Sequence, residues 1–169
     1  DFSDDAVLLR TYYDEMRNLI KEVSGAQQVM VFDHVVRKEP RSDHAKTAGA
    51  VTRVHCDFTD DSARSVLEHV FEQGVFSRRQ GKKLRANELQ SLLRRDVCFF
   101  NVWRNIQSVP VRAWPLAVCD ARSVLPADRL FYEVIYPIYS GIEAENFALR
   151  FSSDHKWYYY PNMTQDECL

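Results

Sequence analysis

His55-Cys56-Asp57 is the segment whose residue types and spacing could do chemistry most directly. A histidine and an aspartate one residue apart can supply two of the three protein ligands of a 2-His-1-carboxylate Fe(II) site. If the segment forms the end of a strand, both side chains point to the same face and can share one ion. A chain with five histidines can also contain this spacing by chance. In that alternative, His55 and Asp57 end a strand and cap the turn that follows.

A second candidate is the Asn-Val-Trp-Arg-Asn-Ile stretch at residues 101–106, where polar groups interrupt an apolar run that we expect to be a strand. An arginine inside such a strand needs a partner, because a buried unpaired charge is very costly. For Arg104 the partner could be the carboxylate of a substrate or co-substrate, held by two hydrogen bonds. A structural salt bridge to Asp120 or Asp96 is the equally weighted alternative, and Asn101 would lie on the opposite face.

A third candidate is the aromatic run from Trp157 to Tyr160, which follows His155. Four consecutive aromatic residues give both faces of a strand a large apolar area, which can line a pocket but more often packs in a core. His155 is the only histidine well downstream of His55, so it could complete a metal site. A hydrogen-bonded structural role for His155 is the favoured interpretation.

Composition and charge narrow the class of protein. The net charge of −2 gives no basic field for nucleic acid or an anionic membrane, and no apolar run is long enough to span a bilayer. The acidic start of the chain is unlike a signal peptide, and the absence of an initial Met suggests a processed or trimmed product. The four cysteines are far apart, which argues against a zinc site. Three of them lie in apolar strand-like runs, where a reduced core cysteine is the better interpretation. We therefore expect a cytoplasmic protein; the oligomeric state is not indicated.

The expected helices all lie in the N-terminal part of the chain. A helix capped by Ser3 or Asp4 should end at Gly25. The other expected elements are a strand at 29–37, a loop at 39–48, a strand at 50–57, a helix at 60–71, an exposed basic loop at 74–83 and a helix from a cap at Asn87 to Leu93.

The second half is expected to be mainly β. The predicted strands are residues 97–106, 114–124, 129–136, 144–151 and 156–160. Short strands at regular spacing are typical of sandwiches, jelly rolls and barrels. Helices followed by antiparallel strands fit a double-stranded β-helix, or jelly roll, with an N-terminal helical layer. We predict a single domain over 1–169, with a helix and first strand in 1–49 and the core in 50–169.

Taken in order, several motifs resemble the fungal hydroxylase/desaturase family, which includes gibberellin-desaturase-like and cephamycin-methoxylation-like proteins. The resemblance covers roughly residues 50–169, and the combined pattern is far more specific than any single motif. The matching segments are His-Cys-Asp-Phe-Thr at 55–59, Ala-Arg at 63–64, Asn-Val-Trp-Arg-Asn-Ile at 101–106, Pro-Leu-Ala-Val-Cys-Asp-Ala-Arg-Ser-Val at 115–124, His-Lys-Trp-Tyr-Tyr-Tyr at 155–160 and Met-Thr-Gln-Asp-Glu at 163–167.

The resemblance implies an Fe(II)- and 2-oxoglutarate-dependent oxygenase that hydroxylates or desaturates a small-molecule secondary metabolite. It implies a jelly-roll fold and makes His55 and Asp57 the proximal metal ligands. The candidates for the pockets are Asn101 and Arg104 for the co-substrate, and Trp103, Tyr158 and Tyr160 for the substrate.

Two departures from the family pattern stand out. The family has proline where this chain has Asn105, which we interpret as a local change where the strand ends. The family also continues past the last motif, and its distal metal histidine and 2-oxoglutarate-binding arginine lie in that continuation. We therefore expect an incomplete jelly roll without its C-terminal strands. The alternatives are a degenerate homologue, or a third ligand supplied by His155.

Two rival classes of function are compatible with the same sequence features. A catalytically incompetent jelly-roll protein could bind a small ligand through its aromatic residues without metal. A cupin-like non-oxidative metal enzyme could use His55 and Asp57 without 2-oxoglutarate. Metal content separates the first rival from the other classes, and dependence on 2-oxoglutarate separates the second from the oxygenase.

Overall fold

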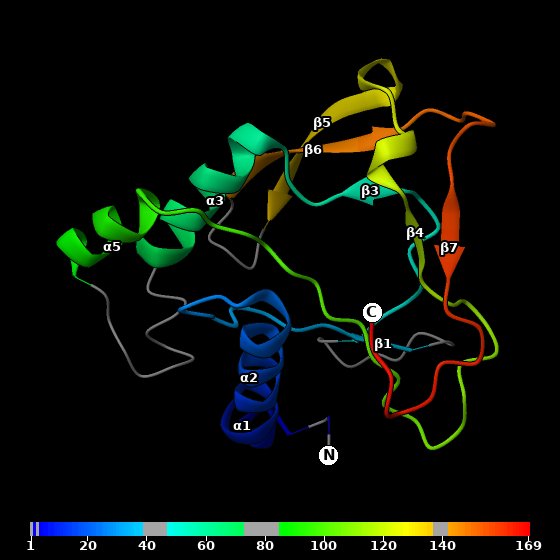
Figure 1. Cartoon of the computed structure of the whole chain (residues 1–169), viewed down its shortest axis with the longest axis horizontal. Coiled ribbons are helices and arrows are strands. Elements are labelled where there is room, and N and C mark those ends of the chain that lie inside the picture. The colour runs from blue at the N-terminus through cyan, green and yellow to red at the C-terminus, as the bar shows by residue number, and fades with distance from the viewer. Residues whose placement is uncertain (1, 3, 39–46, 73–84, 137–141) are drawn as a thin grey trace. The chain divides into compact units, whose positions relative to one another are not determined.

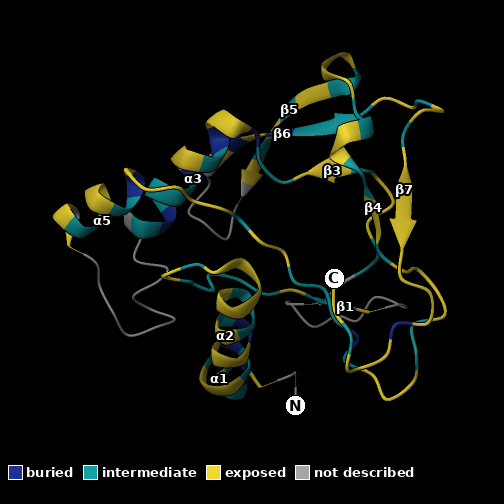
Figure 2. Ribbon diagram, in the orientation of Figure 1, coloured by how far each residue is buried: buried dark blue, intermediate teal, exposed yellow. Residues whose placement is uncertain are grey.

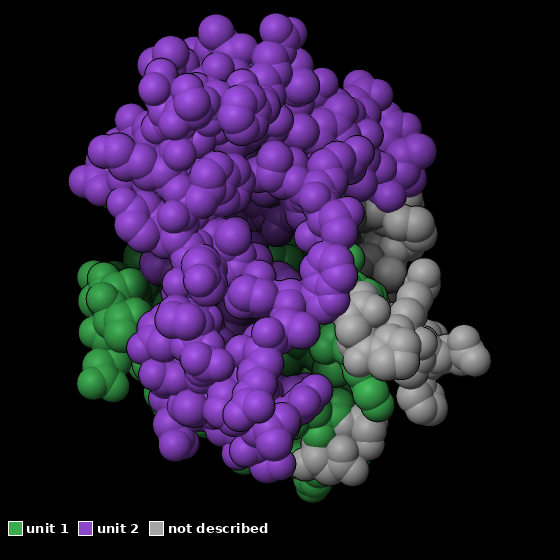
Figure 3. All heavy atoms as spheres, turned by 90° about the vertical axis from the view of Figure 1, so that its right-hand side faces the viewer, with its two compact units in different colours: residues 1–50, 67–97 green, residues 51–66, 98–169 purple. Residues whose placement is uncertain are grey.

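The computed structural model describes residues 2, 4–38, 47–72, 85–136 and 142–169. Figure 3 shows the chain divided into two compact units. The first unit is residues 1–50 with 67–97, and the second is residues 51–66 with 98–169. The motifs that could do chemistry all lie in the second unit. A single domain over the whole chain stays a prediction.

The predicted N-terminal helix is confirmed, and local residues explain both of its ends. It consists of α1 (Asp5–Val7), a π-helical segment η1 (Leu8–Tyr12) and α2 (Tyr13–Ser24) (Figure 1). The Asp4 carboxylate accepts hydrogen bonds from two backbone N–H groups of the first turn, at 2.8 and 3.3 Å. Gly25 ends the helix in the left-handed conformation, with a φ of 69°, and its N–H donates to the carbonyl of Lys21.

Two further helices occur where the sequence predicts them. They are α3 (Asp60–Glu72) and α5 (Ala86–Leu93). The predicted cap at Asn87 is wrong: the backbone N–H of Arg85 donates to the Glu88 carboxylate at 2.8 Å, so the helix begins earlier. The loop predicted at 74–83 lies outside the described residues. No helix in the described ranges is long and apolar enough to cross a membrane.

Strands form three small sheets in the described part of the chain. A three-stranded antiparallel sheet has the order β3-β6-β5, β4 pairs with β7 antiparallel, and β1 pairs with β2 parallel (Figure 1). The strand bounds are β1 Val36–Arg37, β2 Thr47–Ala48, β3 His55–Cys56, β4 Ala117–Cys119, β5 Arg129–Tyr136, β6 Ile142–Leu149 and β7 Trp157–Tyr159. Two short 3₁₀ turns, η2 (Ala121–Ser123) and η3 (Pro126–Asp128), lie between β4 and β5.

The strand predictions succeed for the hairpin and fail elsewhere. The predicted strand 129–136 matches β5, and β6 is shifted by two residues from the predicted 144–151. Four predicted strands are much shorter in the structure: 29–37 contains strand only at β1, 50–57 only at β3, 114–124 only at β4 and 156–160 only at β7. The predicted strand 97–106 is wrong, since it contains only an isolated bridge from Arg104 to Cys168. The last two residues of the predicted loop 39–48 form β2. Residue type favours extended backbone, but a strand also needs a partner in register, and the sequence alone does not show it.

The β5–β6 hairpin provides the frame for the candidate site. It pairs over eight residues, from Arg129 opposite Leu149 to Tyr136 opposite Ile142. At its other edge, β3 adds two residue pairs, with His55 opposite Ala148. The hairpin therefore determines where His55 lies and to which face of the sheet its side chain points.

The start of α3 is hydrogen-bonded to the same strand, β6. The carbonyl of Glu145 accepts from the backbone N–H of Thr59 at 3.2 Å and from the hydroxyl of Ser62 at 2.6 Å. Thr59 and Ser62 also cap each other, since the N–H of each donates to the other hydroxyl at 2.9 and 3.1 Å. The short segment between β3 and α3, which contains Asp57, is therefore attached to β6 at both ends.

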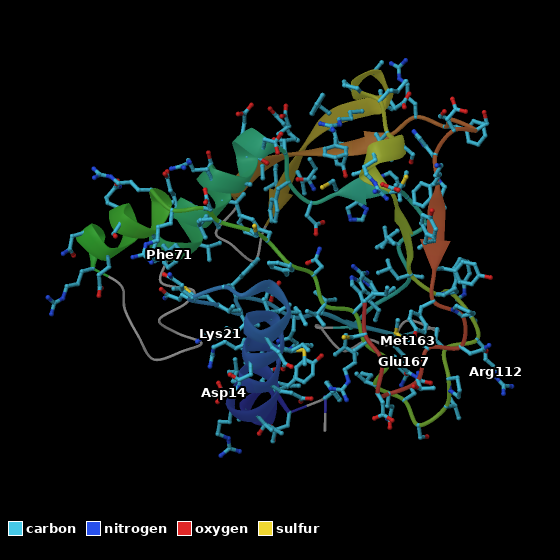
Figure 4. All side chains as sticks on the ribbon, viewed as in Figure 1. Asp14, Lys21, Phe71, Arg112, Met163 and Glu167 are labelled. Carbon is cyan, nitrogen blue, oxygen red and sulfur yellow. The ribbon has the colours of Figure 1, made fainter. Side chains whose placement is uncertain are left out.

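Asn105, where the family pattern has proline, forms bonds that proline cannot. Its side chain is buried and its amide donates to the carbonyls of Val109 at 2.8 Å and Met163 at 3.0 Å. Its amide oxygen accepts from the N–H of Gln107 at 2.9 Å. Met163, labelled in Figure 4, is itself buried. Asn105 thus holds a turn and the C-terminal segment together.

Among the residues whose burial is described, few are buried, and most of these lie on helices or on β6 (Figure 2). In the first unit they include Leu8, Tyr13, Met16, Val70 and Leu93. In the second unit they include Thr59, Ser62, Val66, Asn105, Ala144, Asn146 and Met163.

We predict that Ser62→Ala lowers the free energy of unfolding by about 1–3 kcal/mol, because it leaves the part-buried Glu145 carbonyl and the buried Thr59 N–H with one partner fewer. Urea unfolding of the purified chain measures this. Ser65→Ala on the exposed side of the same helix is the matched control and should be close to neutral. Equal stability of the two variants would contradict the role of Ser62.

Candidate metal site

The side chains of His55 and Asp57 converge, as the spacing predicts. The Nε2 atom of His55 lies 3.4 Å from the Oδ1 atom of Asp57. The two side chains are 31% and 41% exposed, so an ion can reach the point between them. Their position follows from the pairing of β3 with β6 and from the attachment of α3 to β6.

The other ring nitrogen of His55 determines which atom faces the aspartate. Nδ1 lies 2.9 Å from the carbonyl oxygen of Arg53, and a carbonyl can only accept a hydrogen bond. Nδ1 therefore carries a proton, and in the neutral ring Nε2 presents a lone pair toward Asp57. In the neutral ring, two electron-rich atoms at 3.4 Å repel each other, and either a proton on Nε2 or a metal cation between them removes this repulsion.

This arrangement fits a metal ion. Histidines that bind metals usually donate their other N–H to a backbone carbonyl or a carboxylate, which fixes the ring orientation. His55 has this partner in Arg53, and Asp57 adds a hard anionic oxygen of the kind that Fe(II) accepts together with imidazole. Two of the protein ligands of a facial site can therefore come from this segment.

The second oxygen of Asp57 has a partner from a distant part of the sequence. The Nδ2 atom of Asn101 donates to Oδ2 of Asp57 at 3.1 Å. The structure therefore brings Asn101 together with the carboxylate of Asp57. A role for Asn101 in binding the co-substrate stays a prediction.

His155 has a structural partner rather than a place in this site. Its Nε2 lies 3.1 Å from Oδ2 of Asp128, and its side chain is only 2% exposed. The hydrogen bond from His155, with a second from the backbone N–H of Leu125, lowers the pKa of Asp128. The described residues contain no group of three or more His, Cys, Asp or Glu side chains that could hold a metal. This contact agrees with the favoured structural interpretation of His155, and a role for His155 as the third ligand stays a prediction.

The strand-like segment around Arg104 is tied to the end of the chain. Trp103 exchanges two backbone hydrogen bonds with Leu169, at 2.8 and 2.9 Å, and Arg104 forms a bridge with Cys168. Both side chains are partly buried. The roles of Trp103 and Arg104 in binding substrate or co-substrate stay predictions.

Asp120, one suggested partner of Arg104, is paired with Arg122. The Arg122 guanidinium donates to both carboxylate oxygens, from Nε at 2.9 and 3.3 Å and from Nη2 at 2.8 Å. These bonds, followed by the bond from the backbone N–H of Arg122, hold the pKa of Asp120 at about 2. A salt bridge from Asp120 to Arg104 is therefore not what the structure shows.

The aromatic strand β7 is exposed along its length (Figure 2). Tyr158 is 57% exposed and Tyr160 is 39% exposed, so the usual core packing of such residues is not what the described chain shows. A hydrogen bond with Glu167, which Figure 4 labels, raises the pKa of Tyr160. The assignment of Tyr158 and Tyr160 to a substrate pocket stays a prediction.

Arg53 is a residue at the site that the sequence did not single out. Its carbonyl orients His55, and its guanidinium lies 4.7 Å from the centre of the Tyr132 ring on β5. The i, i+2 spacing of Arg53, His55 and Asp57 was the available signal, because alternate residues of an extended segment share a face.

Comparison with known proteins gives a consistent result. A family model described as "Oxidoreductase/YMDC permease-like domain" matches residues 1–169. The hydroxylase/desaturase efuI of Hormonema carpetanum is 31% identical over 187 residues, which cover 98% of this chain and 58% of that protein. The Fe(II)/2-oxoglutarate-dependent dioxygenase nvfI of Aspergillus novofumigatus is 33% identical over 165 residues, 97% of this chain and 53% of that protein.

Solved structures agree. The structure of the iron and alpha-ketoglutarate-dependent endoperoxidase NvfI superimposes with a TM-score of 0.74 at 28% identity, covering 98% of this chain and 55% of that one. Its W199F variant gives the same TM-score at 26% identity. The chain spans a little over half the length of the relatives it matches.

We predict that Asp120→Asn destabilises the fold at neutral pH and that this difference disappears in acid. The folded-state pKa of about 2 is below the ordinary value of 3.8, so the ionised carboxylate stabilises the fold above about pH 4, and the contribution is lost as the pH falls toward 2. Unfolding of the native chain and the variant should be compared from pH 7 to pH 2. Asp154→Asn, at an exposed aspartate, is the control. A difference that persists at pH 2 would contradict the prediction.

Proposed function

Because the chain belongs to the family described as an oxidoreductase/YMDC permease-like domain, we propose that it acts as an Fe(II)- and 2-oxoglutarate-dependent oxygenase. Its reaction would be hydroxylation or desaturation of a small-molecule secondary metabolite. The single observation that carries this proposal is the convergence of His55 Nε2 and Asp57 Oδ1 at 3.4 Å, with Nδ1 already bonded to the Arg53 carbonyl. The names of the relatives, a hydroxylase/desaturase and a 2-oxoglutarate-dependent dioxygenase, support it.

The protein's part in this chemistry is to hold the metal ion and to orient its ligands. His55 and Asp57 would hold Fe(II), and the negative charge of Asp57 would offset part of the charge of the ion. Arg53 keeps the His55 ring in the orientation that presents Nε2. When bound, iron and 2-oxoglutarate would together activate dioxygen for removal of hydrogen from the substrate. A third ligand would come from outside the described residues, since they contain no third side chain at this point.

We also propose a jelly roll as the architecture to which the strands belong. The antiparallel sheet β3-β6-β5 and the antiparallel pair β4-β7 supply strands of the kind that such a fold stacks face to face. The similarity to the NvfI structure over 98% of this chain supports this proposal.

The pocket assignments and the location of the protein are proposals as well. Arg104 would bind a carboxylate of the co-substrate, while Trp103, Tyr158 and Tyr160 would contact an apolar part of the substrate. The four cysteines, all free in the structure, are compatible with a reducing compartment such as the cytoplasm.

The principal rival is a binding protein without catalysis. The absence of a three-residue metal cluster among the described residues is the observation that favours it. Iron binding by the chain separates the two, because the rival has no use for His55 and Asp57 as ligands. A cupin-like non-oxidative metal enzyme would bind iron but would not respond to 2-oxoglutarate.

We predict that Asp57→Ala abolishes Fe(II) binding, because it removes one of the two ligands that the segment supplies. Anaerobic calorimetric titration of Fe(II) into the native chain and the variant measures this. Asp154→Ala, which removes an exposed carboxylate from the same unit, is the control and should bind like the native chain. Unchanged Fe(II) affinity in Asp57→Ala would refute the assignment of the site.

A further inference from the structure

Asn101 contacts the metal-site carboxylate from the side opposite His55. Its Nδ2 lies 3.1 Å from Oδ2 of Asp57, while Oδ1 of Asp57 faces His55. The amide must present its nitrogen here, because an amide oxygen would repel the carboxylate. One oxygen of Asp57 is therefore engaged by the Asn101 donor, and the other faces Nε2 of His55.

The segment that carries Asn101 is fixed beside Asp57 at two further points. On one side, the Phe99 ring packs on the Phe58 ring, with centroids 4.9 Å apart. On the other side, Trp103 forms two backbone hydrogen bonds with Leu169. Asn101 lies between these anchors, so its contact with Asp57 is built into the packing of the chain.

We infer that Asn101 is a positioning residue that makes Asp57 bind its metal ion through one oxygen only. This inference rests on the proposed function and deepens it, and it replaces the expectation that Asn101 binds the co-substrate. Without the donor, Asp57 could turn about its side-chain bonds or bind the ion through both oxygens. Binding through both oxygens would occupy a position at the ion that the co-substrate needs.

The exposure of Asn101 separates this role from a structural one. The side chain is exposed, so the hydrogen bond to Asp57 adds little to the stability of the fold. Its effect should therefore appear in metal binding and not in unfolding. Outer partners of metal ligands commonly change metal affinity by about 10- to 100-fold when they are removed.

The test measures the dissociation constant of Mn(II), a stand-in for Fe(II) that is stable in air, from the EPR signal of free Mn(II). Asn101→Leu keeps a similar size and removes the donor, while Asn101→Gln keeps the amide. We expect Asn101→Leu to raise the dissociation constant about tenfold and Asn101→Gln to stay within about threefold of the native chain. Thermal unfolding of both variants should match that of the native chain. Asn18→Ala, at an exposed asparagine of α2, is the control.

The outcomes separate this inference from the proposed function. If His55→Ala weakens Mn(II) binding and Asn101→Leu does not, the site stands and the positioning role is overturned. The positioning role is also overturned if Asn101→Gln binds Mn(II) as weakly as Asn101→Leu does, because the loss is then caused by side-chain shape and not by the missing donor. If His55→Ala binds Mn(II) as the native chain does, the metal site itself is wrong.

Discussion

The two-residue ladder between β3 and β6 is the interaction on which the site depends. It places His55 opposite Ala148 and Cys56 opposite Phe147. So short a ladder is weak alone, but the Glu145 carbonyl on the same strand accepts two further bonds from the start of α3. Asp57 lies between these two attachments. The eight-residue β5–β6 hairpin gives β6 its rigidity, so a long local structure fixes a short functional segment.

Around that segment, each hydrogen bond fixes one atom of the two candidate ligands. The Arg53 carbonyl accepts a hydrogen bond from Nδ1 of His55, and the Asn101 amide donates one to Oδ2 of Asp57. The two atoms that face each other, Nε2 and Oδ1, are both electron-rich in the neutral-ring form and lie 3.4 Å apart. Backbone and amide partners thus leave a site in which a cation removes a repulsion. Because these partners orient the ligand atoms, their removal is expected to lower the affinity for the metal.

The sequence predicts those features that depend on near neighbours. The ends of α2 follow from Asp4 and Gly25, and the convergence of His55 and Asp57 follows from the two-residue period of an extended chain. The strands predicted at 29–37 and 97–106 fail because residue type does not show which backbone pairs with which. The contact of Asn101 with Asp57, 44 residues away, could not be predicted from the sequence for the same reason. His155 gave no local signal for its bond to Asp128, 27 residues away.

The most direct test of the account is the electron spin echo envelope modulation of Mn(II) bound to the purified chain, which detects nitrogen nuclei at the ion. The account predicts modulation from one imidazole that disappears in His55→Ala and persists in His155→Gln. Modulation that persists in His55→Ala, or that is lost only in His155→Gln, would contradict the central claim that His55 and Asp57 form the metal site.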